Sequence, residues 1–358
     1  MKPILLFSAV LFCMTACKKS GTDNNTPAPA PYTKIEYTGA TFFSEARYLL
    51  AAAAAGNKIV FAGGNGPVGI SKVVDIYDVS TNTWTTAQLS EARTGLEGAG
   101  AGNKIIFAGG KKGGASLSKT VDIYDGSANA WTTAQLSEEK RFFAAAGTGN
   151  KIAIGGGYND VVNLKTVDIY DVSTNTWTTA QLGEARNCLS AAAAGNKIVF
   201  AGGVNVTTVS KFVDIYDIST NAWTTAQLSE ARSLLKSAGA GNKIVFAGGI
   251  TAAAVLSKTV DIYDISTNTW TTAQLSEARR YLSAAAAGNK IVFAGGNNDI
   301  TVSKTVDIYD VSTNTWTTAQ LSEARSDLSA AGVGNKILFA GGYNAGFSKT
   351  VDVFTLSK

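Results

Sequence analysis

Short apolar runs, separated by glycine-rich or polar turns, recur along the chain from Tyr32 onward. In the first unit, an alanine-rich run at residues 49–55 is followed by a Gly-Asn turn and the apolar run 58–63. Apolar and polar residues then alternate at residues 73–79, and a Ser-Thr-Asn turn leads to a last run around residues 84–89. Runs of this length between turn residues predict four antiparallel strands, named a, b, c and d here in chain order.

The same unit is repeated seven times, with a period of 46 or 47 residues. Each strand b ends in a Gly-Gly pair, at residues 63–64, 109–110, 156–157, 202–203, 248–249, 295–296 and 341–342. Six strands d carry a tryptophan: Trp84, Trp131, Trp177, Trp223, Trp270 and Trp316. A repeat of this length and composition predicts an all-β fold, a seven-bladed β-propeller built from four-stranded antiparallel sheets.

Intrinsic propensity offers a helical alternative for strand a. Ser44-Glu45-Ala46-Arg47, followed by an alanine run, could be a capped helix. The equivalent segment 95–102 argues against it, because four of its eight residues are glycine. Small residues are instead expected in a strand where several sheets crowd around a common axis, so strand a is interpreted as a strand.

The pattern resembles the Kelch family. The resemblance rests on the Gly-Gly pair, on a tyrosine in strand c and on the tryptophan seven residues later, and it covers almost all of residues 32–358. The tyrosines are Tyr77, Tyr124, Tyr170, Tyr216, Tyr263 and Tyr309. We expect each tyrosine to face its tryptophan across the c–d hairpin.

The seventh unit ends at residues 351–354 without a tryptophan or a strand d. The missing strand is expected at the other end of the chain, where residues 35–43 precede Ser44-Glu45-Ala46-Arg47 as strand d precedes each later Glu-Ala-Arg. An N-terminal strand would then complete the last blade, close the ring and remove two sheet edges.

Residues 1–17 have the features of a signal peptide, with Lys2 before a short apolar stretch. Met14-Thr15-Ala16-Cys17 resembles a bacterial lipobox, which predicts lipidation of Cys17; the alternative is ordinary signal-peptide cleavage. Residues 18–31 form a polar, proline-rich tether, and residues 32–358 form the propeller. The expected location is the bacterial cell envelope, with the lipid as the sole membrane anchor and the side of the membrane left open.

The amino-acid composition argues against several kinds of functional site. The chain has no histidine and three cysteines, so a transition-metal site or a histidine-based catalytic constellation is not expected. The net charge is +4 and basic residues alternate with acidic ones, which is atypical of a nucleic-acid-binding surface. No cofactor is expected, and the propeller is expected to be monomeric.

Strand direction places the a–b and c–d turns on one face of the ring, here the turn face, and the b–c and d–a loops on the other, here the loop face. The turn face is nearly invariant among the units, whereas the loop face holds most of the differences. Divergent loops on a rigid scaffold commonly form binding sites, although loops also drift after duplication. The candidate ligand-binding residues with unrepeated chemistry are Tyr48, Glu97, Lys111, Lys112, Phe142, Tyr158, Asp160, Arg280, Tyr281, Asp299, Asp327 and Tyr343.

A second set of candidates is a ring of arginines near the d–a loops: Arg47, Arg93, Arg141, Arg186, Arg232, Arg279 and Arg325. In Kelch propellers that capture acidic peptides, arginines near this turn contact the ligand, and the resemblance implies the same role here. The alternative is structural, because a glutamate precedes most of these arginines by two residues and Glu–Arg pairs could join adjacent blades.

Three functions remain open from the sequence. The first is a non-catalytic module that binds a protein or a glycan through the loop face. The second is a sugar-acid epimerase of the kind found among Kelch propellers, which could work with Arg, Glu and Tyr alone. The third is a purely structural or adhesive repeat protein.

Overall fold

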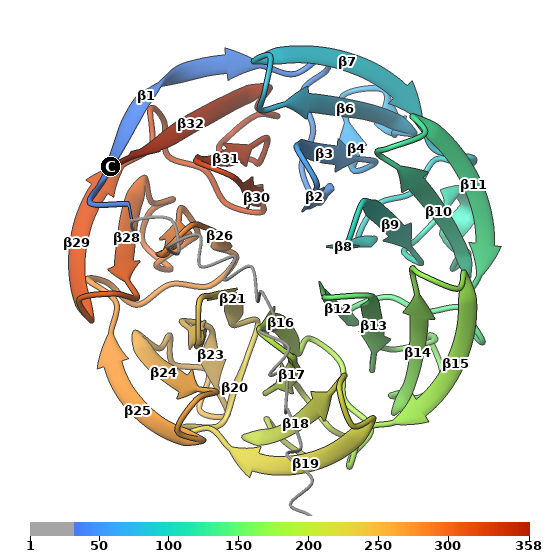
Figure 1. The fold of residues 1–358 in the computed structure, drawn as a ribbon, viewed down its shortest axis with the longest axis vertical. Helices are drawn as coiled ribbons and strands as arrows, with labels where there is room; N and C mark the ends of the chain where they lie inside the picture. The colour runs from blue at the N-terminus through green and yellow to red at the C-terminus, as the bar shows by residue number, and fades with distance from the viewer. Residues whose placement is uncertain (1–31) are drawn as a thin grey trace, which may run out of the picture. The chain divides into compact units, whose positions relative to one another are not determined.

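A computed structural model describes residues 32–358, which belong to one compact unit. Seven four-stranded antiparallel sheets surround a central axis, and the innermost strand of each sheet is strand a (Figure 1). The expected all-β, seven-bladed propeller is therefore confirmed. The blades are numbered 1 to 7 here, in the chain order of their innermost strands.

The blades share one strand order, a-b-c-d from the axis outward. Blades 1 to 3 consist of β2 (Ala51–Ala55), β3 (Lys58–Ala62), β6 (Val73–Asp78) and β7 (Thr83–Gln88); β8 (Glu97–Ala101), β9 (Lys104–Ala108), β10 (Thr120–Asp125) and β11 (Ala130–Gln135); and β12 (Ala144–Thr148), β13 (Lys151–Gly155), β14 (Thr166–Asp171) and β15 (Thr176–Gln181).

Blades 4 to 6 consist of β16 (Ser190–Ala194), β17 (Lys197–Ala201), β18 (Phe212–Asp217) and β19 (Ala222–Gln227); β21 (Lys236–Ala240), β22 (Lys243–Ala247), β24 (Thr259–Asp264) and β25 (Thr269–Gln274); and β26 (Ser283–Ala287), β27 (Lys290–Ala294), β28 (Thr305–Asp310) and β29 (Thr315–Gln320). Blade 7 consists of β30 (Ser329–Val333), β31 (Lys336–Ala340), β32 (Thr350–Ser357) and β1 (Lys34–Phe42). The loops add the short pairs β4 (Asn65–Gly66) with β5 (Gly69–Ile70) and β20 (Arg232–Ser233) with β23 (Ile250–Thr251), and one 3-10 turn, η1 (Gly113–Ala115).

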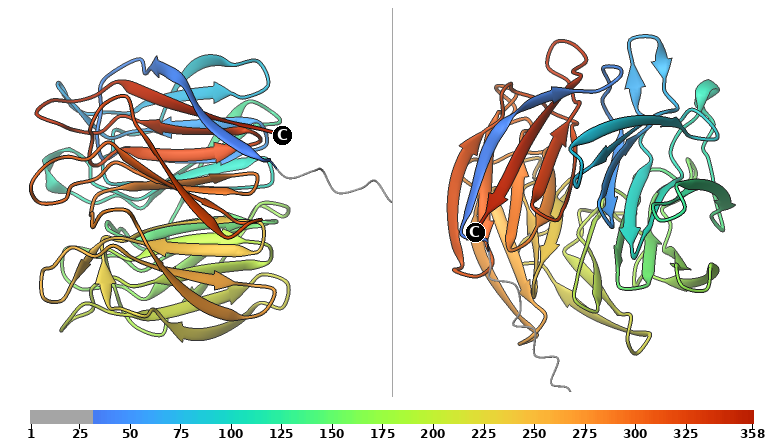
Figure 2. Two further views of the ribbon diagram at one scale, coloured as in Figure 1. Left: turned by 90° about the vertical axis from the view of Figure 1, so that its left-hand side faces the viewer. Right: turned by 45° about the horizontal axis from the view of Figure 1, so that its top comes forward.

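The N-terminal strand closes the ring as predicted. β1 pairs antiparallel with β32, with Tyr37 opposite Phe354 and a register shift between Tyr37 and Gly39. The rings of Tyr37 and Phe354 meet edge to face, 5.7 Å between centroids. Figures 1 and 2 both show β1 beside β32 at the outer rim. The first and last strands of the propeller thus share one sheet, and both belong to the same blade.

The alanine runs are strands, as the glycine content of their equivalents indicated. Small residues are required because neighbouring innermost strands approach closely: a Cβ added at Gly100 would lie 2.2 Å from the carbonyl oxygen of Ala54 in the adjacent blade. The strands begin two residues later than predicted in blade 1, at Ala51, because Leu49 has a positive φ of 51° that ends the extended backbone.

Apolar clusters fill the spaces between consecutive blades. The predicted cross-strand pairs are present: Tyr77 lies opposite Trp84, with ring centroids 5.0 Å apart. The Tyr77 hydroxyl donates a hydrogen bond to Asn82 Oδ1, at 2.8 Å. Each blade therefore buries one face against each neighbour, and the ring is held by seven similar interfaces.

The predicted signal peptide, Cys17 and the tether lie outside the described residues. No helix of residues 32–358 is long and apolar enough to cross a membrane. Tyr32 and Thr33, where the description begins, lie on the turn face. The Thr33 N–H donates to the Ser357 carbonyl at 3.0 Å, and the Tyr32 ring packs against Gly288 in the a–b turn of blade 6.

Candidate binding site on the loop face

Seven buried cations repeat around the ring, each next to a buried aspartate of strand c. Arg186 is typical: its Nη1 donates to the carbonyl oxygens of Gly202 and Phe212, both at 2.6 Å, and its Nη2 lies 2.5 Å from Asp214 Oδ2. The side chain of Arg186 is fully buried. Together these pairs form the cation–aspartate ring: Arg47–Asp75, Arg93–Asp122, Lys140–Asp168, Arg186–Asp214, Arg232–Asp261, Arg279–Asp307 and Arg325–Asp352.

Each cation of this ring joins two blades. The Arg93 guanidinium bonds to Gly109, Thr120 and Asp122 in blade 2, while its own carbonyl accepts a hydrogen bond from Gly64 N–H in blade 1, at 2.8 Å. Burial lowers the pKa of Arg93, and the carboxylate of Asp122 opposes that change. An Arg in this setting is a structural cation whose donors are directed at fixed acceptors.

The predicted arginine ring requires two corrections. Six of the seven arginines are buried, so they do not present their charge to a ligand on the loop face. The structural alternative is supported, but the main partner is the strand-c aspartate: Nε lies 3.6–3.9 Å from the preceding glutamate, beyond direct hydrogen-bond distance. The glutamates instead accept hydrogen bonds from serines of the next blade, such as Ser257 Oγ to Glu230 at 2.6 Å.

The second correction concerns the third unit. The ring cation there is Lys140, fully buried with its Nζ 3.0 Å from Asp168 Oδ2, and not Arg141. Arg141 occupies the next position, where its backbone pairs with Tyr158 as Tyr48 pairs with Asn65 in blade 1. The sequence Glu138-Glu139-Lys140-Arg141 offers two adjacent cations, and only the register of the loop decides between them.

Arg141 belongs to a cluster on the loop face with three of the other candidates. Its Nη2 lies 2.6 Å from Asp160 Oδ1, and its guanidinium carbon lies 4.8 Å from the ring centroid of Phe142 and 5.9 Å from that of Tyr158. Phe142 is about half exposed. The ion pair fixes the guanidinium beside the rings, in the arrangement of a cation–π contact.

A second cluster of the same design lies three blades further along. Arg280 Nη2 is 2.8 Å from Asp299 Oδ1, and its guanidinium carbon lies 5.2 Å from the Tyr281 ring centroid. Both aspartates have a positive φ, 68° at Asp160 and 67° at Asp299, because each sits in a tight b–c loop. The structure thus brings each arginine together with candidates that are 17 to 19 residues away in sequence.

The remaining candidates divide between the outer loops and the axis. Tyr48 packs on Tyr343, 5.6 Å between centroids, and also on Phe347, where blade 7 meets blade 1. Lys111 pairs through its backbone with Thr94, and Lys112 Nζ lies 3.7 Å from Glu91. Glu97 and Asp327 lie apart from all of these, in a cavity on the axis.

The axial cavity opens where the d–a loops enter the innermost strands and has a volume of about 340 Å³. Its upper lining comes from one residue of each unit, the residue two positions before strand a; these seven residues form the rim: Leu49, Gly95, Phe142, Cys188, Leu234, Tyr281 and Asp327. Below the rim, the first residues of the seven innermost strands line the wall: Ala51, Glu97, Ala144, Ser190, Lys236, Ser283 and Ser329.

The rim has an unusual backbone. All seven residues have φ between 51° and 60°, although only Gly95 is a glycine. This conformation is unfavourable for residues with a side chain and persists where the surrounding structure enforces it. Backbone hydrogen bonds from one rim residue to the next help to hold it, including Gly95 N–H to Leu49 C=O at 3.0 Å and Cys188 N–H to Phe142 C=O at 2.8 Å. The rim side chains are therefore held in place around the mouth.

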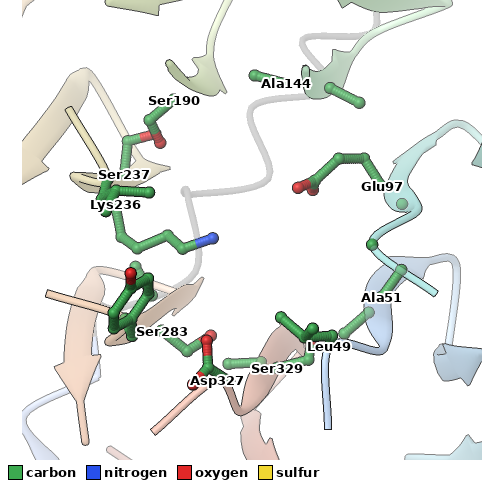
Figure 3. Close-up of a pocket in the computed structure, with 18 of the residues that line it drawn as sticks. Leu49, Ala51, Glu97, Ala144, Ser190, Lys236, Ser237, Ser283, Asp327 and Ser329 are labelled. Atoms are coloured by element: carbon green, nitrogen blue, oxygen red, sulfur yellow. The ribbon is translucent and has the colours of Figure 1, made fainter. Parts of the chain in front are cut away.

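Two opposite charges break the sevenfold pattern of the wall. The Glu97 carboxylate in blade 2 and the Lys236 amino group in blade 5 extend into the cavity from opposite sides (Figure 3). Among the described residues, no side-chain hydrogen bond and no ion pair within 4.0 Å engages either group. Burial raises the pKa of Glu97, and the positive charge of Lys236 partly offsets that rise.

Asp327 adds a second carboxylate at the rim. It accepts a hydrogen bond from Ser326 Oγ, at 3.0 Å, and burial raises its pKa as well. Cys188 also lies at the rim, where burial raises the pKa of its thiol to about 11, so the thiol form predominates at neutral pH. The candidates with charge in the cavity are therefore Glu97 and Asp327, facing one cation.

Sequence reasoning missed Lys236. The signal was present, because aligning the first residue of strand a in the seven units gives Ala, Glu, Ala, Ser, Lys, Ser and Ser. Glu97 was identified as a candidate because it interrupts a run of small residues. Lys236 follows two leucines, and this context is typical of the polar end of a loop. Only the ring geometry shows that the two residues occupy equivalent positions on one wall.

Comparison with known families agrees with the fold. A family model described as the KLHDC2/KLHL20/DRC7 Kelch-repeats domain matches residues 95–278 and 190–358, and a model described as the Kelch motif matches residues 46–88. The first model alone spans more than half of the chain. No curated protein matches the chain.

Proposed function

Because the chain belongs to the Kelch-repeat β-propeller family, whose propellers are generally protein-interaction modules, we propose that it is a non-catalytic module that binds a protein at the bacterial cell envelope. The loop face is the proposed binding surface. The observation that carries this assignment is the contrast between the faces: the exposed, unrepeated side chains gather on the loop face, around a cavity of about 340 Å³.

The two arginine–aromatic clusters supply the side chains that protein interfaces favour. Phe142 and Tyr281 are partly exposed at the rim, and Arg141 and Arg280 are held beside them by their aspartates. Aromatic residues and arginine dominate the energetics of protein interfaces, and a side chain held before binding loses less conformational entropy. These clusters are the proposed anchors.

The envelope location rests on the lipobox-like sequence ending at Cys17. Replacing Cys17 with Ala is expected to release the protein from the membrane fraction, and unchanged membrane retention of that variant contradicts the anchor.

The binding proposal is tested with purified protein as bait in quantitative cross-linking to envelope extracts. The parent is compared with Phe142→Ala/Tyr281→Ala on the loop face and with Thr81→Ala/Thr174→Ala on the turn face. Both pairs are exposed, or partly exposed, so folding is expected to be unaffected. We expect one or a few proteins to be enriched by the parent and the turn-face variant, and lost with the loop-face variant. Equal enrichment by all three, or saturable binding to a glycan array alone, contradicts a protein-binding loop face.

The epimerase alternative has no specific observation in its favour. It drew on arginines near the d–a loops, and the structure buries six of the seven predicted arginines against strand-c aspartates. Their Nη groups already donate to those aspartates and to backbone carbonyls, so they are not directed at a substrate.

A further inference from the structure

The axial cavity contains two partly buried charged side chains that the scaffold does not require. At the wall positions, five of the seven units carry alanine or serine, and the innermost strands are equally regular in all of them. The two exceptions, Glu97 and Lys236, place opposite charges in a confined space without a direct protein partner. Charges that lose water without gaining a partner destabilise the folded protein. Their presence at two unrepeated positions is explained if a ligand supplies the missing partners.

The neighbours of the two charges differ in chemistry. Lys236 lies between Ser190 and Ser283 in the adjacent blades, and the Ser190 hydroxyl is already hydrogen-bonded to that of Ser237, at 2.7 Å. The ammonium group of Lys236 therefore extends into the cavity without a side-chain partner, and it matches the acceptor oxygens of a carboxylate. Glu97 lies between Ala51 and Ala144, whose side chains offer no hydrogen bond. Its carboxylate matches a positively charged nitrogen.

The lining around the charges is mixed. Leu49, Phe142 and Leu234 contribute apolar side chains at the rim, and alanines, glycines and serines line the wall below them. The volume, about 340 Å³, is at the lower end of the range of small-molecule sites, which is roughly 300–1,000 Å³. A ligand that fits has two charged ends and a short apolar middle.

We propose that the axial cavity binds a small zwitterion, with its carboxylate at Lys236 and its ammonium group at Glu97. A ligand of one sign would pair with one wall charge and leave the other unpaired beside it. A zwitterion pairs with both, and free amino acids and very short peptides are the chemical class with these two groups. This site goes beyond the proposed protein-binding function, because its two charged groups are on the innermost strands below the rim, although the anchors Phe142 and Tyr281 line the same mouth.

The test is calorimetric titration of the full propeller with a ladder of zwitterions in which the charge separation grows: glycine, 4-aminobutyrate, 6-aminohexanoate and diglycine. Pentanoate and pentylamine serve as singly charged controls. We expect one member of this series to bind most tightly and both controls to bind at least about tenfold more weakly, since each control leaves one cavity charge unpaired. Equal binding of pentanoate, or no binding by any zwitterion, overturns the proposal.

The repeat itself provides the matched variants. Lys236→Ser introduces the residue of blades 4 and 6, and Glu97→Ala introduces the residue of blades 1 and 3, so both replacements occur in the native ring. Each is expected to weaken the best zwitterion about tenfold or more. Lys304→Ser removes an exposed lysine outside the cavity and is expected to change nothing. Similar losses in Lys304→Ser and Lys236→Ser would indicate a non-specific charge effect and overturn the site.

The double variant Glu97→Lys/Lys236→Glu distinguishes the loss of charge pairing with the ligand from structural disruption of the cavity. It keeps both charges and reverses their positions, so zwitterion binding is expected to be restored, at least in part, relative to either single variant. Failure of the zwitterion test with intact protein capture refutes only the cavity site. If the parent captures no protein but still binds the zwitterion, only the proposed function of the loop face is refuted.

Discussion

Arg232 and Lys236 are two cations four residues apart in one segment, and their surroundings are opposite. Arg232 is fully buried, and its guanidinium bonds to the Gly248 and Thr259 carbonyls, at 2.9 and 2.6 Å, and to Asp261. Lys236 extends into the axial cavity without an ion-pair partner among the described residues. The first position carries a cation in all seven units, whereas the second carries a cation only once.

The difference separates scaffold from site. A group that recurs in every blade contributes the same interaction to every interface, and the ring needs all of them to close. A group that occurs once cannot be required by an architecture that forms without it six times. In a protein of near-identical repeats, the departures from the repeat therefore identify the residues whose role is not structural.

The largest difference in stability between the two positions is expected when Arg232 and Lys236 are each replaced by a neutral residue. Arg232→Ala leaves the Asp261 carboxylate buried without its partner and is expected to lower the free energy of unfolding by about 3–5 kcal/mol. Lys236→Ser is expected to change it by about 0.5 kcal/mol or less, because the side chain has no partner to lose. Urea unfolding at pH 7 measures both. Equal losses would show that the cavity lysine is part of the scaffold after all.

A smaller effect is expected from the one irregular member of the cation–aspartate ring. Lys140 makes a single bond to Asp168, whereas each arginine of the ring also donates to two backbone carbonyls. Lys140→Arg supplies the missing donors and is expected to raise the free energy of unfolding by about 1 kcal/mol, and Arg232→Lys is expected to lower it by a similar or larger amount. The two variants are compared by denaturant unfolding. A stability loss in both directions would mean that blade 3 is built specifically for lysine.

The smallest effect is the pH dependence contributed by Glu97. Burial raises its pKa in the folded protein above the ordinary value, so the folded state binds this proton more tightly than the unfolded chain. Stability therefore falls as the pH rises through the raised pKa, and ionised Glu97 destabilises the protein at neutral pH. Glu97→Gln is expected to melt at a higher temperature than the parent at pH 7, with the gap closing toward pH 4. A gap that widens as the pH falls would show that Glu97 has a stabilising partner.

The sequence was sufficient for the scaffold because the scaffold is periodic. Six copies of the Tyr–Trp spacing and seven Gly-Gly pairs overdetermine the strands, and the missing strand d of the last unit required residues 35–43 to complete it. The helical alternative for the alanine runs failed on glycines such as Gly100, whose close approach to Ala54 allows no larger residue.

The site could be predicted only in part, because its residues are far apart in the sequence and come together only when the seven blades close into a ring. Asp75 lies 28 residues from Arg47, so the sequence pointed to the nearer Glu45 as the partner. The identity of Lys140 as the third ring cation depends on a one-residue register. Glu97 and Asp327 were found as unrepeated charges, but their shared cavity with Lys236 depends on the closure of seven blades around one axis.

The most direct test of this account is a variant in which the cavity is made symmetrical, Glu97→Ala/Lys236→Ser. Its urea unfolding midpoint and its affinity for the best zwitterion are measured beside the parent. The account predicts a midpoint equal to or above that of the parent, because two partly buried charges without a direct partner are removed, together with loss of zwitterion binding. A variant that unfolds at markedly lower urea, or that binds the zwitterion as the parent does, would contradict the claim that departures from the repeat at the axis serve a ligand.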